Sequence, residues 1–166
     1  MHKWLRRCTA AFGTLEMCSE LDHSGHPRLK VPFLTVDEAG QATEPFTLVA
    51  LEKVAVQGHV ALVGDHMQLP PFVKSQSARE KGLERSMLER LHLDGGCKEL
   101  LLAEQHRMHP QLWSWPNSTF YEDKVATGAL AMQRRAAGGL PWREPLAFVH
   151  VTGWGRRVAV TCASPV

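Results

Sequence analysis

The stretch Val31-Pro-Phe-Leu-Thr-Val-Asp-Glu38, together with the later stretch His59-Val-Ala-Leu-Val-Gly-Asp65, decides the fold of this chain. Each begins as a short apolar run and ends at acidic residues, which is typical of a buried strand and the loop that follows it. Between them, Thr43 and Glu44 supply the cap and first turn of a helix, with Pro45 in that turn. Helical spacing then continues through Phe46, Val49, Ala50, Lys53 and Val54.

A strand, a helix of about a dozen residues and a second strand make a βαβ unit. Both strands are almost continuously apolar. We therefore expect them to pair in parallel, in a sheet that helices cover on both faces. The sequence predicts the α/β class.

Four further segments follow this unit. The pattern predicts an amphipathic helix over residues 82–92 and a third buried strand over Leu100-Leu-Leu-Ala103. Residues 126–145, rich in Ala, Gly, Arg and Pro, are interpreted as a connector, and residues 146–151 as a fourth strand.

A second long helix is predicted from His109 to Tyr121, despite Pro116. Large apolar side chains lie along it, and we expect them to pack in the fold rather than to stack on bases. They are Leu112, Trp113, Phe120 and Tyr121.

Composition excludes several classes of protein. The 166 residues are 22% charged and 44% hydrophobic, which argues against wholesale disorder. The net charge of +2 and pI near 8.4 neither require nor exclude a nucleic-acid partner. The four cysteines form no C-x-x-C pair, so neither a disulfide framework nor a standard zinc site is indicated. No uncharged apolar run approaches the roughly 18 residues of a membrane span, and we expect no membrane partner.

Asp37 and Glu38 stand at the carboxyl end of the first predicted strand, where open α/β sheets place their ligands. An Asp there can hold the Mg²⁺ that bridges nucleotide phosphates, and the adjacent Glu can position an attacking water. The alternative is a pair of strand-end acids that simply face solvent.

The loop Gly64-Asp-His-Met-Gln-Leu-Pro-Pro71 follows the second strand, so a parallel sheet places it beside the first pair of acids. Gly64 allows a sharp exit, and Pro70 and Pro71 stiffen the loop. Gln68 offers the neutral hydrogen-bonding side chain that a γ-phosphate sensor needs. An ordinary polar turn explains the glycine and prolines, but not why a glutamine follows the acids at both strand ends.

A third polar motif, Gln105-His-Arg-Met-His-Pro110, follows the third predicted strand. Arg107 has a fixed charge and forked donors that match phosphate geometry. In phosphoryl transfer an arginine supplied at this point contributes roughly 10³ to 10⁵ in rate. The alternative is a surface ion pair, which contributes at most about 1 kcal/mol.

In order and spacing, these three motifs resemble consecutive motifs of superfamily 1 helicases, in the branch that includes the regulator of nonsense transcripts, senataxin-like and immunoglobulin mu-binding helicases. The resemblance extends through Gly82-Leu-Glu-Arg-Ser-Met-Leu-Glu-Arg-Leu91 and Trp115-Pro-Asn-Ser-Thr-Phe-Tyr121, and covers approximately residues 8–152. It implies an ATP-dependent helicase of the 5'-to-3' type that moves on single-stranded RNA or DNA. ATP and Mg²⁺ are the implied cofactors, RNA-decay or RNA-processing proteins the further partners, and the cytoplasm or nucleus the location.

The resemblance also implies roles for single residues. Asp37 would coordinate Mg²⁺, Glu38 activate water, Gln68 sense the γ-phosphate and Arg107 contact it. Gln41 would couple the nucleotide and nucleic-acid sites.

Other positions would contact the nucleotide or the nucleic acid. His106 stands where the family usually has Tyr, and its imidazole would stack on adenine with less area. Nucleotide contacts are also implied for Gly64 and Asp65. The residues implied near the nucleic acid are Thr9, Ala10 and Pro70, the first two in a segment that resembles a family strand.

The implied fold is a RecA-like P-loop NTPase domain, a parallel sheet flanked by helices. Residues 1–107 would be the C-terminal part of a first RecA-like domain, 108–145 a helix and connector, and 146–166 the start of a second domain. The sequence holds no G-x-x-x-x-G-K-[ST] loop, so we expect an incomplete fold and a fragment inactive by itself. Two alternatives stay open: a catalytically inactive interaction or decoy fragment, and another P-loop ATPase, which does not predict the second and third motifs.

Overall fold

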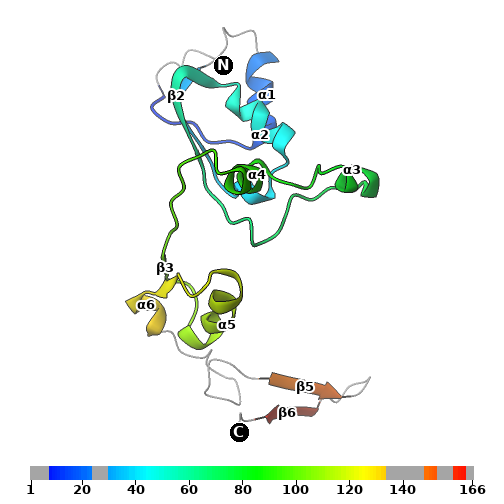
Figure 1. The fold of residues 1–166 in the computed structure, drawn as a ribbon, viewed down its shortest axis with the longest axis vertical. Helices are drawn as coiled ribbons and strands as arrows, with labels where there is room; N and C mark the ends of the chain where they lie inside the picture. The colour runs from blue at the N-terminus through cyan, green and yellow to red at the C-terminus, as the bar shows by residue number, and fades with distance from the viewer. Residues whose placement is uncertain (1–7, 24–29, 134–147, 153–158, 164–166) are drawn as a thin grey trace. The chain divides into compact units, whose positions relative to one another are not determined.

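The computed structural model describes residues 8–23, 30–133, 148–152 and 159–163 of the chain (Figure 1). The chain divides into two compact units, residues 1–99 and residues 100–166. None of the helices in the described ranges has both the length and the apolar character needed to cross a lipid bilayer.

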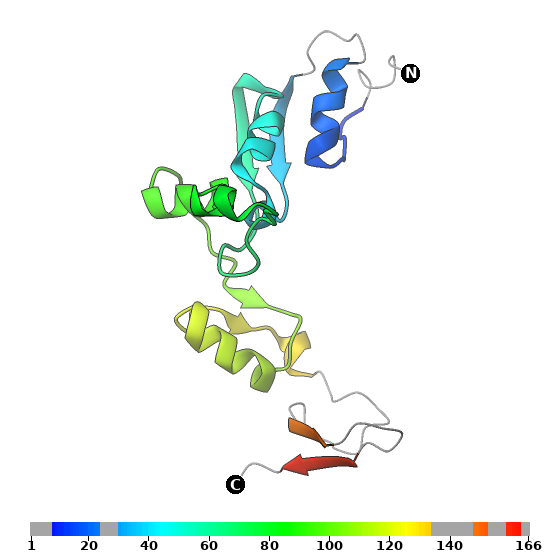
Figure 2. The ribbon, with the colours of Figure 1, turned by 90° about the vertical axis from the view of Figure 1, so that its right-hand side faces the viewer.

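The first unit is built on the predicted βαβ arrangement. Strand β1 (Val31–Val36) leads through helix α2 (Glu44–Leu51) to strand β2 (Val54–Leu62), and the two strands pair in parallel (Figure 2). Val36 lies opposite Leu62, so both strands end at the same edge. The predicted α/β class, the first strand and the parallel pairing are confirmed.

Helix α2 is shorter than the sequence pattern predicts, and the placement of Lys53 and Val54 in it is wrong. The helix ends at Leu51, and the N–H of Lys53 closes a tight turn on the carbonyl of Ala50 at 3.0 Å. The carbonyl of Lys53 then accepts from the Val31 N–H at 2.8 Å, which starts the sheet. β-branched valines follow, and these favour a strand over a helix.

The two-stranded sheet is not covered on both faces by the described residues, so this prediction is wrong for them. Val36 is buried, as are Thr47 and Ala50 of α2, which contacts β1. Phe33 and Val60, in contrast, are 59% and 42% exposed. Helix α1 (Leu15–His23) packs against α2 and leaves these strand side chains uncovered.

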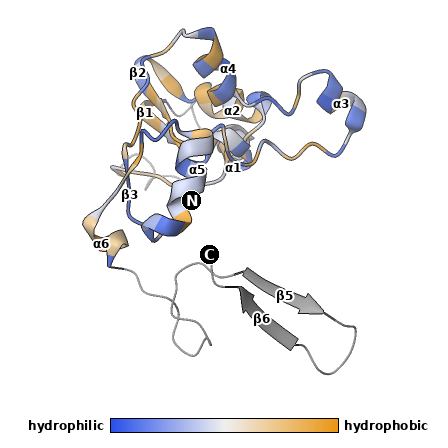
Figure 3. Cartoon of the chain, turned by 60° about the horizontal axis from the view of Figure 1, so that its bottom comes forward, coloured by the Kyte–Doolittle hydropathy of each residue, from blue (hydrophilic) through white to orange (hydrophobic). Residues whose placement is uncertain are grey.

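Two short helices follow the sheet, and each begins at a serine cap. Ser75 Oγ accepts from the Ala78 N–H at 3.3 Å before α3 (Gln76–Glu80), which is largely hydrophilic (Figure 3). Ser86 Oγ accepts from the Glu89 N–H at 3.1 Å before α4 (Met87–Asp94). The predicted start at residue 82 is wrong because Gly82 has a φ of +89°, which no α-helix contains.

The second unit contains its own small parallel pair, β3 (Glu104–Gln105) with β4 (Ala126–Thr127). The predicted strand over residues 100–103 is wrong: its three leucines are 53–86% exposed. Only the Ala103 carbonyl joins the pairing, by accepting from the Ala126 N–H at 2.8 Å, because the partner strand has just two residues. β3 therefore pairs outside the sheet of β1 and β2.

Helix α5 (Pro110–Phe120) connects these two strands and confirms the predicted helix, Pro116 included. The indole Nε1 of Trp113 donates to the Val125 carbonyl at 3.0 Å, and its ring stacks on Tyr121 with centroids 5.3 Å apart. The packing role predicted for these two aromatic residues is confirmed. Phe120 makes an edge contact with Tyr121 but is 41% exposed, and Leu112 is 39% exposed.

The remaining described elements are a short helix and a hairpin. α6 (Ala129–Met132) follows β4, so the start of the predicted connector is structured, and residues 134–145 lie outside the described ranges. Strand β5 (Phe148–Thr152) confirms the fourth strand except for residues 146–147, which the structure does not describe. It pairs antiparallel with β6 (Ala159–Ala163).

Candidate nucleotide site

The acidic loop, residues 37–41, follows β1 as a tight turn. Asp37 Oδ1 accepts from the Glu38 N–H at 3.0 Å, and the Glu38 carbonyl accepts from the Gln41 N–H at 2.9 Å. Glu38 has a φ of 51° and a ψ of 37°, in the left-handed region that a residue with a side chain adopts at a cost. The three polar side chains of the loop are exposed while Ala39 is buried, so the turn presents its chemistry to solvent.

The side chain of Gln41 bonds to that of Glu38, three residues earlier in the acidic loop. Its Nε2 donates to Glu38 Oε2 at 3.2 Å. A glutamine that holds the carboxylate of Glu38 is suited to sense movement of that group, which agrees with the coupling role predicted from the resemblance. The role itself stays a prediction.

The loop of residues 64–71, called the phosphate-facing loop after the role predicted for Gln68, follows β2. Asp65 organises it: Oδ1 accepts from the Met67 N–H at 2.9 Å and Oδ2 accepts from Gln68 Nε2 at 2.8 Å. Asp65 is thus bound to its own loop, whereas Asp37 bonds only to its neighbour among the described residues. Pro70 is exposed and Pro71 is buried, so the loop is anchored at its end.

Backbone hydrogen bonds join the acidic loop to the phosphate-facing loop. The Val63 N–H donates to the Val36 carbonyl, and the Ala39 N–H donates to the Val63 carbonyl, both at 2.8 Å. The parallel pairing is thereby extended past the ends of both strands. Six of the predicted site residues consequently lie on one edge of the first unit: Asp37, Glu38, Gln41, Gly64, Asp65 and Gln68.

Two glycines allow this approach. A Cβ on Gly40 would stand 2.8 Å from the Asp65 carbonyl oxygen. A Cβ on Gly64 would stand 2.9 Å from the Ala39 nitrogen and 3.0 Å from that of Gly40. Real Cβ atoms essentially never come closer than 3.0 Å to another heavy atom, and the obstructing atoms here are backbone, so neither glycine can be replaced without a shift of the loops. Gly64 therefore does more than permit the sharp exit predicted from the sequence.

The acidic loop fits a Mg²⁺–phosphate group. Mg²⁺ bound with a nucleotide takes one or two carboxylates and completes its shell with water and phosphate oxygens. Asp37 has an exposed carboxylate whose Oδ2 accepts no hydrogen bond from the described residues. Within the same ranges, no cluster of three or more His, Cys, Asp or Glu side chains could hold an ion by protein ligands alone.

The third motif lies in the second unit, where Gln105 shapes its turn. The side-chain Oε1 accepts from the N–H groups of Arg107 and Met108, at 2.9 and 2.8 Å. The side-chain Nε2 donates to the Met108 carbonyl at 2.8 Å and to Thr127 Oγ1 at 3.2 Å. Sequence reasoning did not assign a role to Gln105; its position, between a strand and a Pro-ended turn, was the available signal.

His106 and Arg107 are both exposed on this turn. The His106 ring lies against Gly128, where a Cβ would overlap Nδ1, and its Nε2 is 3.8 Å from Glu104 Oε1. The Arg107 guanidinium forms no ion pair in the described part of the chain. Because Arg107 belongs to the second unit, its convergence with the acidic loop stays a prediction.

The residues predicted near nucleic acid are on exposed segments. Thr9 and Ala10 precede α1 without regular structure, so the strand expected there is not formed. Near Pro70, the side chains of Leu69 and Phe72 are 71% and 91% exposed. Their contacts with nucleic acid stay predictions.

Comparison with known proteins extends the resemblance in both directions along the chain, from residue 1 to residue 161. One family model described as an AAA domain matches residues 1–76, and a second model of the same description matches residues 83–161. The match therefore continues beyond residue 152, to which the sequence motifs alone carried it.

Several curated proteins are similar to this chain. The 3'-5' exoribonuclease HELZ2 of Homo sapiens is 38% identical over 135 residues, 80% of this chain and 4% of that protein. The Regulator of nonsense transcripts 1 homolog of Drosophila melanogaster is 39% identical over 118 residues, 71% and 10% of the two chains. The ATP-dependent helicase NAM7 of Saccharomyces cerevisiae is 36% identical over 141 residues, 83% and 14%. The chain thus spans a small part of each relative's length.

Proposed function

The chain belongs to the superfamily 1 helicases of the regulator-of-nonsense-transcripts family, and from this premise we propose that it carries the γ-phosphate end of an ATP-hydrolysing site. The observation that carries the proposal is the backbone bonding between the acidic loop and the phosphate-facing loop. It places Asp37, Glu38 and Gln68 on one strand edge, all exposed.

Each residue has a chemical task in this proposal. Mg²⁺, bound with the nucleotide, would neutralise charge on the phosphates. Asp37 would hold the ion, and Glu38 would orient the water that attacks the γ-phosphate and accept its proton as the bond to ADP breaks. Gln68, oriented by Asp65, donates to a γ-phosphate oxygen. When the nucleotide leaves, that bond would be lost, and Gln68 would keep its hydrogen bond to Asp65.

The whole-protein activity that we propose is ATP-dependent, 5'-to-3' movement on single-stranded RNA or DNA in a RecA-like fold. Arg107 would contact the γ-phosphate and His106 the adenine, from the second unit. Thr9, Ala10 and Pro70 would lie near the nucleic acid, which such proteins hold chiefly through its backbone. The proposal includes RNA-decay or RNA-processing partners.

The experiment uses a chimera, because the sequence lacks a glycine-rich phosphate loop. This chain replaces the matching segment of the Saccharomyces cerevisiae helicase, which is 36% identical to it over 141 residues. Glu38→Gln in the chimera should lower poly-uridine-stimulated ATP turnover by about 10² to 10⁴, the contribution of a positioned base, and leave Mg²⁺–ATP affinity within a few fold.

Glu80→Gln is the matched control, since Glu80 is an exposed carboxylate on α3 that bonds to Gln76 at 3.1 Å. It should leave turnover unchanged. A folded chimera without ATPase activity, or one in which Glu38→Gln turns over normally, would contradict the proposal. The former result would instead support an inactive interaction or decoy fragment.

A further inference from the structure

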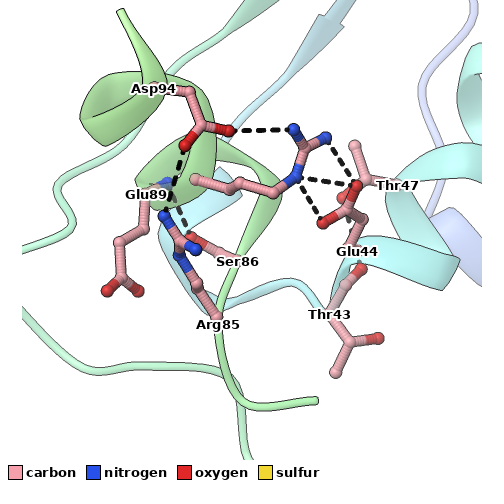
Figure 4. A network of polar contacts seen from close by, with 8 residues as sticks. Thr43, Glu44, Thr47, Arg85, Ser86, Glu89 and Asp94 are labelled. Carbon is pink, nitrogen blue, oxygen red and sulfur yellow. Dashed lines mark hydrogen bonds and ion pairs between the residues drawn. The ribbon is translucent and has the colours of Figure 1, made fainter. Parts of the chain in front are cut away.

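An ion pair connects the first residue of α2 with the middle of α4. Arg90 Nε donates to Glu44 Oε2 at 2.9 Å, and Arg90 Nη2 donates to Glu44 Oε1 at 2.6 Å (Figure 4). Two near-parallel N–H···O bonds of this kind are the bidentate geometry that a guanidinium provides and an ammonium does not. The pair therefore fixes orientation as well as distance.

The surrounding charges keep the pair ionised. Hydrogen bonds from Arg90 lower the pKa of the Glu44 carboxyl, and the positive charges of Arg90 and Arg85 lower this pKa further. Asp94 Oδ2 accepts from Arg90 Nη1 at 3.4 Å, and Asp94 Oδ1 lies 3.8 Å from Arg85 Nη2 (Figure 4). The four side chains thus form a series of alternating charge, in the order Glu44, Arg90, Asp94 and Arg85. Glu44 remains charged at neutral pH.

The pair joins two helices that lie next to the two loops of the proposed site. Glu44 comes three residues after Gln41, and its neighbour Thr43 pairs with Ser86 at the start of α4. On the same helix, Leu88 Cδ2 lies 3.4 Å from the place of a Cβ on Gly64. α4 consequently contacts the end of the acidic loop and the start of the phosphate-facing loop.

We propose that Glu44 and Arg90 are positioning residues for the site: their bidentate pair holds α4 against both loops and so keeps the acidic loop and the phosphate-facing loop at one spacing. The inference rests on the proposed function. Neither residue touches the nucleotide. Loss of the pair would allow α4 to shift away from Gly64, and the Ala39–Val63 backbone bond would open more often.

The ion pairs of Glu52, at the C-terminal end of α2, provide a matched control. Glu52, which caps the other end of α2, bonds to Lys53 Nζ at 2.9 Å and Lys30 Nζ at 3.0 Å. It joins α2 to the start of the sheet, at the edge opposite the two loops. Glu52→Gln therefore removes a comparable interaction from the same βαβ unit without touching α4.

Amide hydrogen exchange of the full chain, measured by NMR without nucleotide, tests the positioning role. Arg90→Gln should make the Ala39 and Val63 amides exchange about tenfold faster and leave the amide of Ala61, which faces β1 from the middle of the pairing, unchanged. Glu44→Gln should do the same, and Glu52→Gln should not. Equal acceleration of every amide, or acceleration confined to α4, would overturn the proposal.

Two further variants separate position from charge. Arg90→Lys keeps the charge without the fork, so the two amides should still exchange faster than in the parent chain. The exchanged pair Glu44→Arg with Arg90→Glu should restore at least half of the protection; no recovery would count against the pair.

Turnover separates this inference from the proposed function. In the chimera, Arg90→Gln should lower kcat about tenfold with the KM for ATP nearly unchanged, because loop spacing affects the reacting geometry more than binding. If Arg90→Gln accelerates exchange as expected but the parent chimera has no ATPase activity, the proposed function is wrong and the positioning role still holds. If exchange is accelerated but kcat is unchanged, loop spacing does not control turnover.

Discussion

Gly40 and Gly64 set the spacing of the proposed site at the scale of single residues. Each lies where a Cβ would collide with the backbone of the opposite loop. Because these obstructing atoms belong to hydrogen-bonded backbone, the loops would have to separate to admit a side chain. The requirement for glycine is therefore one of space between two segments.

Gly64→Ala should lower the free energy of unfolding by about 1–3 kcal/mol, the usual cost of forcing extra atoms into a packed contact. Gly96→Ala is the control, since nothing lies within 4 Å of its Cβ position and its φ is not left-handed. The control should stay within about 0.5 kcal/mol of the parent chain. Urea unfolding curves measure both, and equal losses would show that the close approach does not limit stability.

The sequence could indicate most residues of the first unit's site, because acids and amides at the ends of parallel strands must share an edge. Asp37, Glu38 and Gln68 were found this way. Their hydrogen-bond partners could not be predicted, because the left-handed turn at Glu38 depends on the packing of Ala39. Gln105 was missed since its role is to bond a turn, a task that many polar residues perform.

At the scale of elements, local pattern gave the bounds of β1, but it missed the start of β2 at Val54 and wrongly predicted a strand over residues 100–103. β1 pairs with a nine-residue strand and matched its predicted bounds. Leu100, Leu101 and Leu102 have the same apolar character but lie before a two-residue pairing and remain exposed. Periodicity reports the burial that a segment would favour, and the partner strand decides whether it occurs.

Glu52, in the turn between α2 and β2, should make the free energy of unfolding depend on pH. Hydrogen bonds from Lys53 and then Lys30 lower the pKa of Glu52 from 4.5 to about 2. The unfolded chain therefore binds a proton first as the pH falls, so this contribution is present above pH 4.5 and is lost towards pH 2.

Unfolding curves of the parent chain and Glu52→Gln at several pH values measure this effect. The difference between the two should shrink as the pH falls from 5 to 2, and it should also shrink in 1 M salt because the pair is exposed. A difference independent of pH would assign the loss to packing of the side chain.

The two units define the molecule as a whole. Each has its own parallel strand pair, and residues 95–103 between α4 and β3 contain no helix or strand and are exposed. Sequence motifs could predict that both units belong to one family, but not how far regular structure extends between them.

Limited trypsin digestion should cut early after Lys98, because an exposed segment without regular hydrogen bonding enters a protease most easily. Mass spectrometry would then find a fragment that ends at Lys98. Lys98→Gln should remove this cut alone. Early cuts after the buried Lys53 or after Arg90 of α4, with Lys98 intact, would contradict the division at this segment.

Glu38 places a chemical demand and a folding demand in opposition. Its left-handed backbone suits glycine or asparagine better than a residue with a longer side chain. If its carboxylate orients water, thermostabilisation at this position would exchange turnover for heat resistance. A library sorted only for soluble expression would drift away from glutamate here, and position 38 should be held fixed in any such screen.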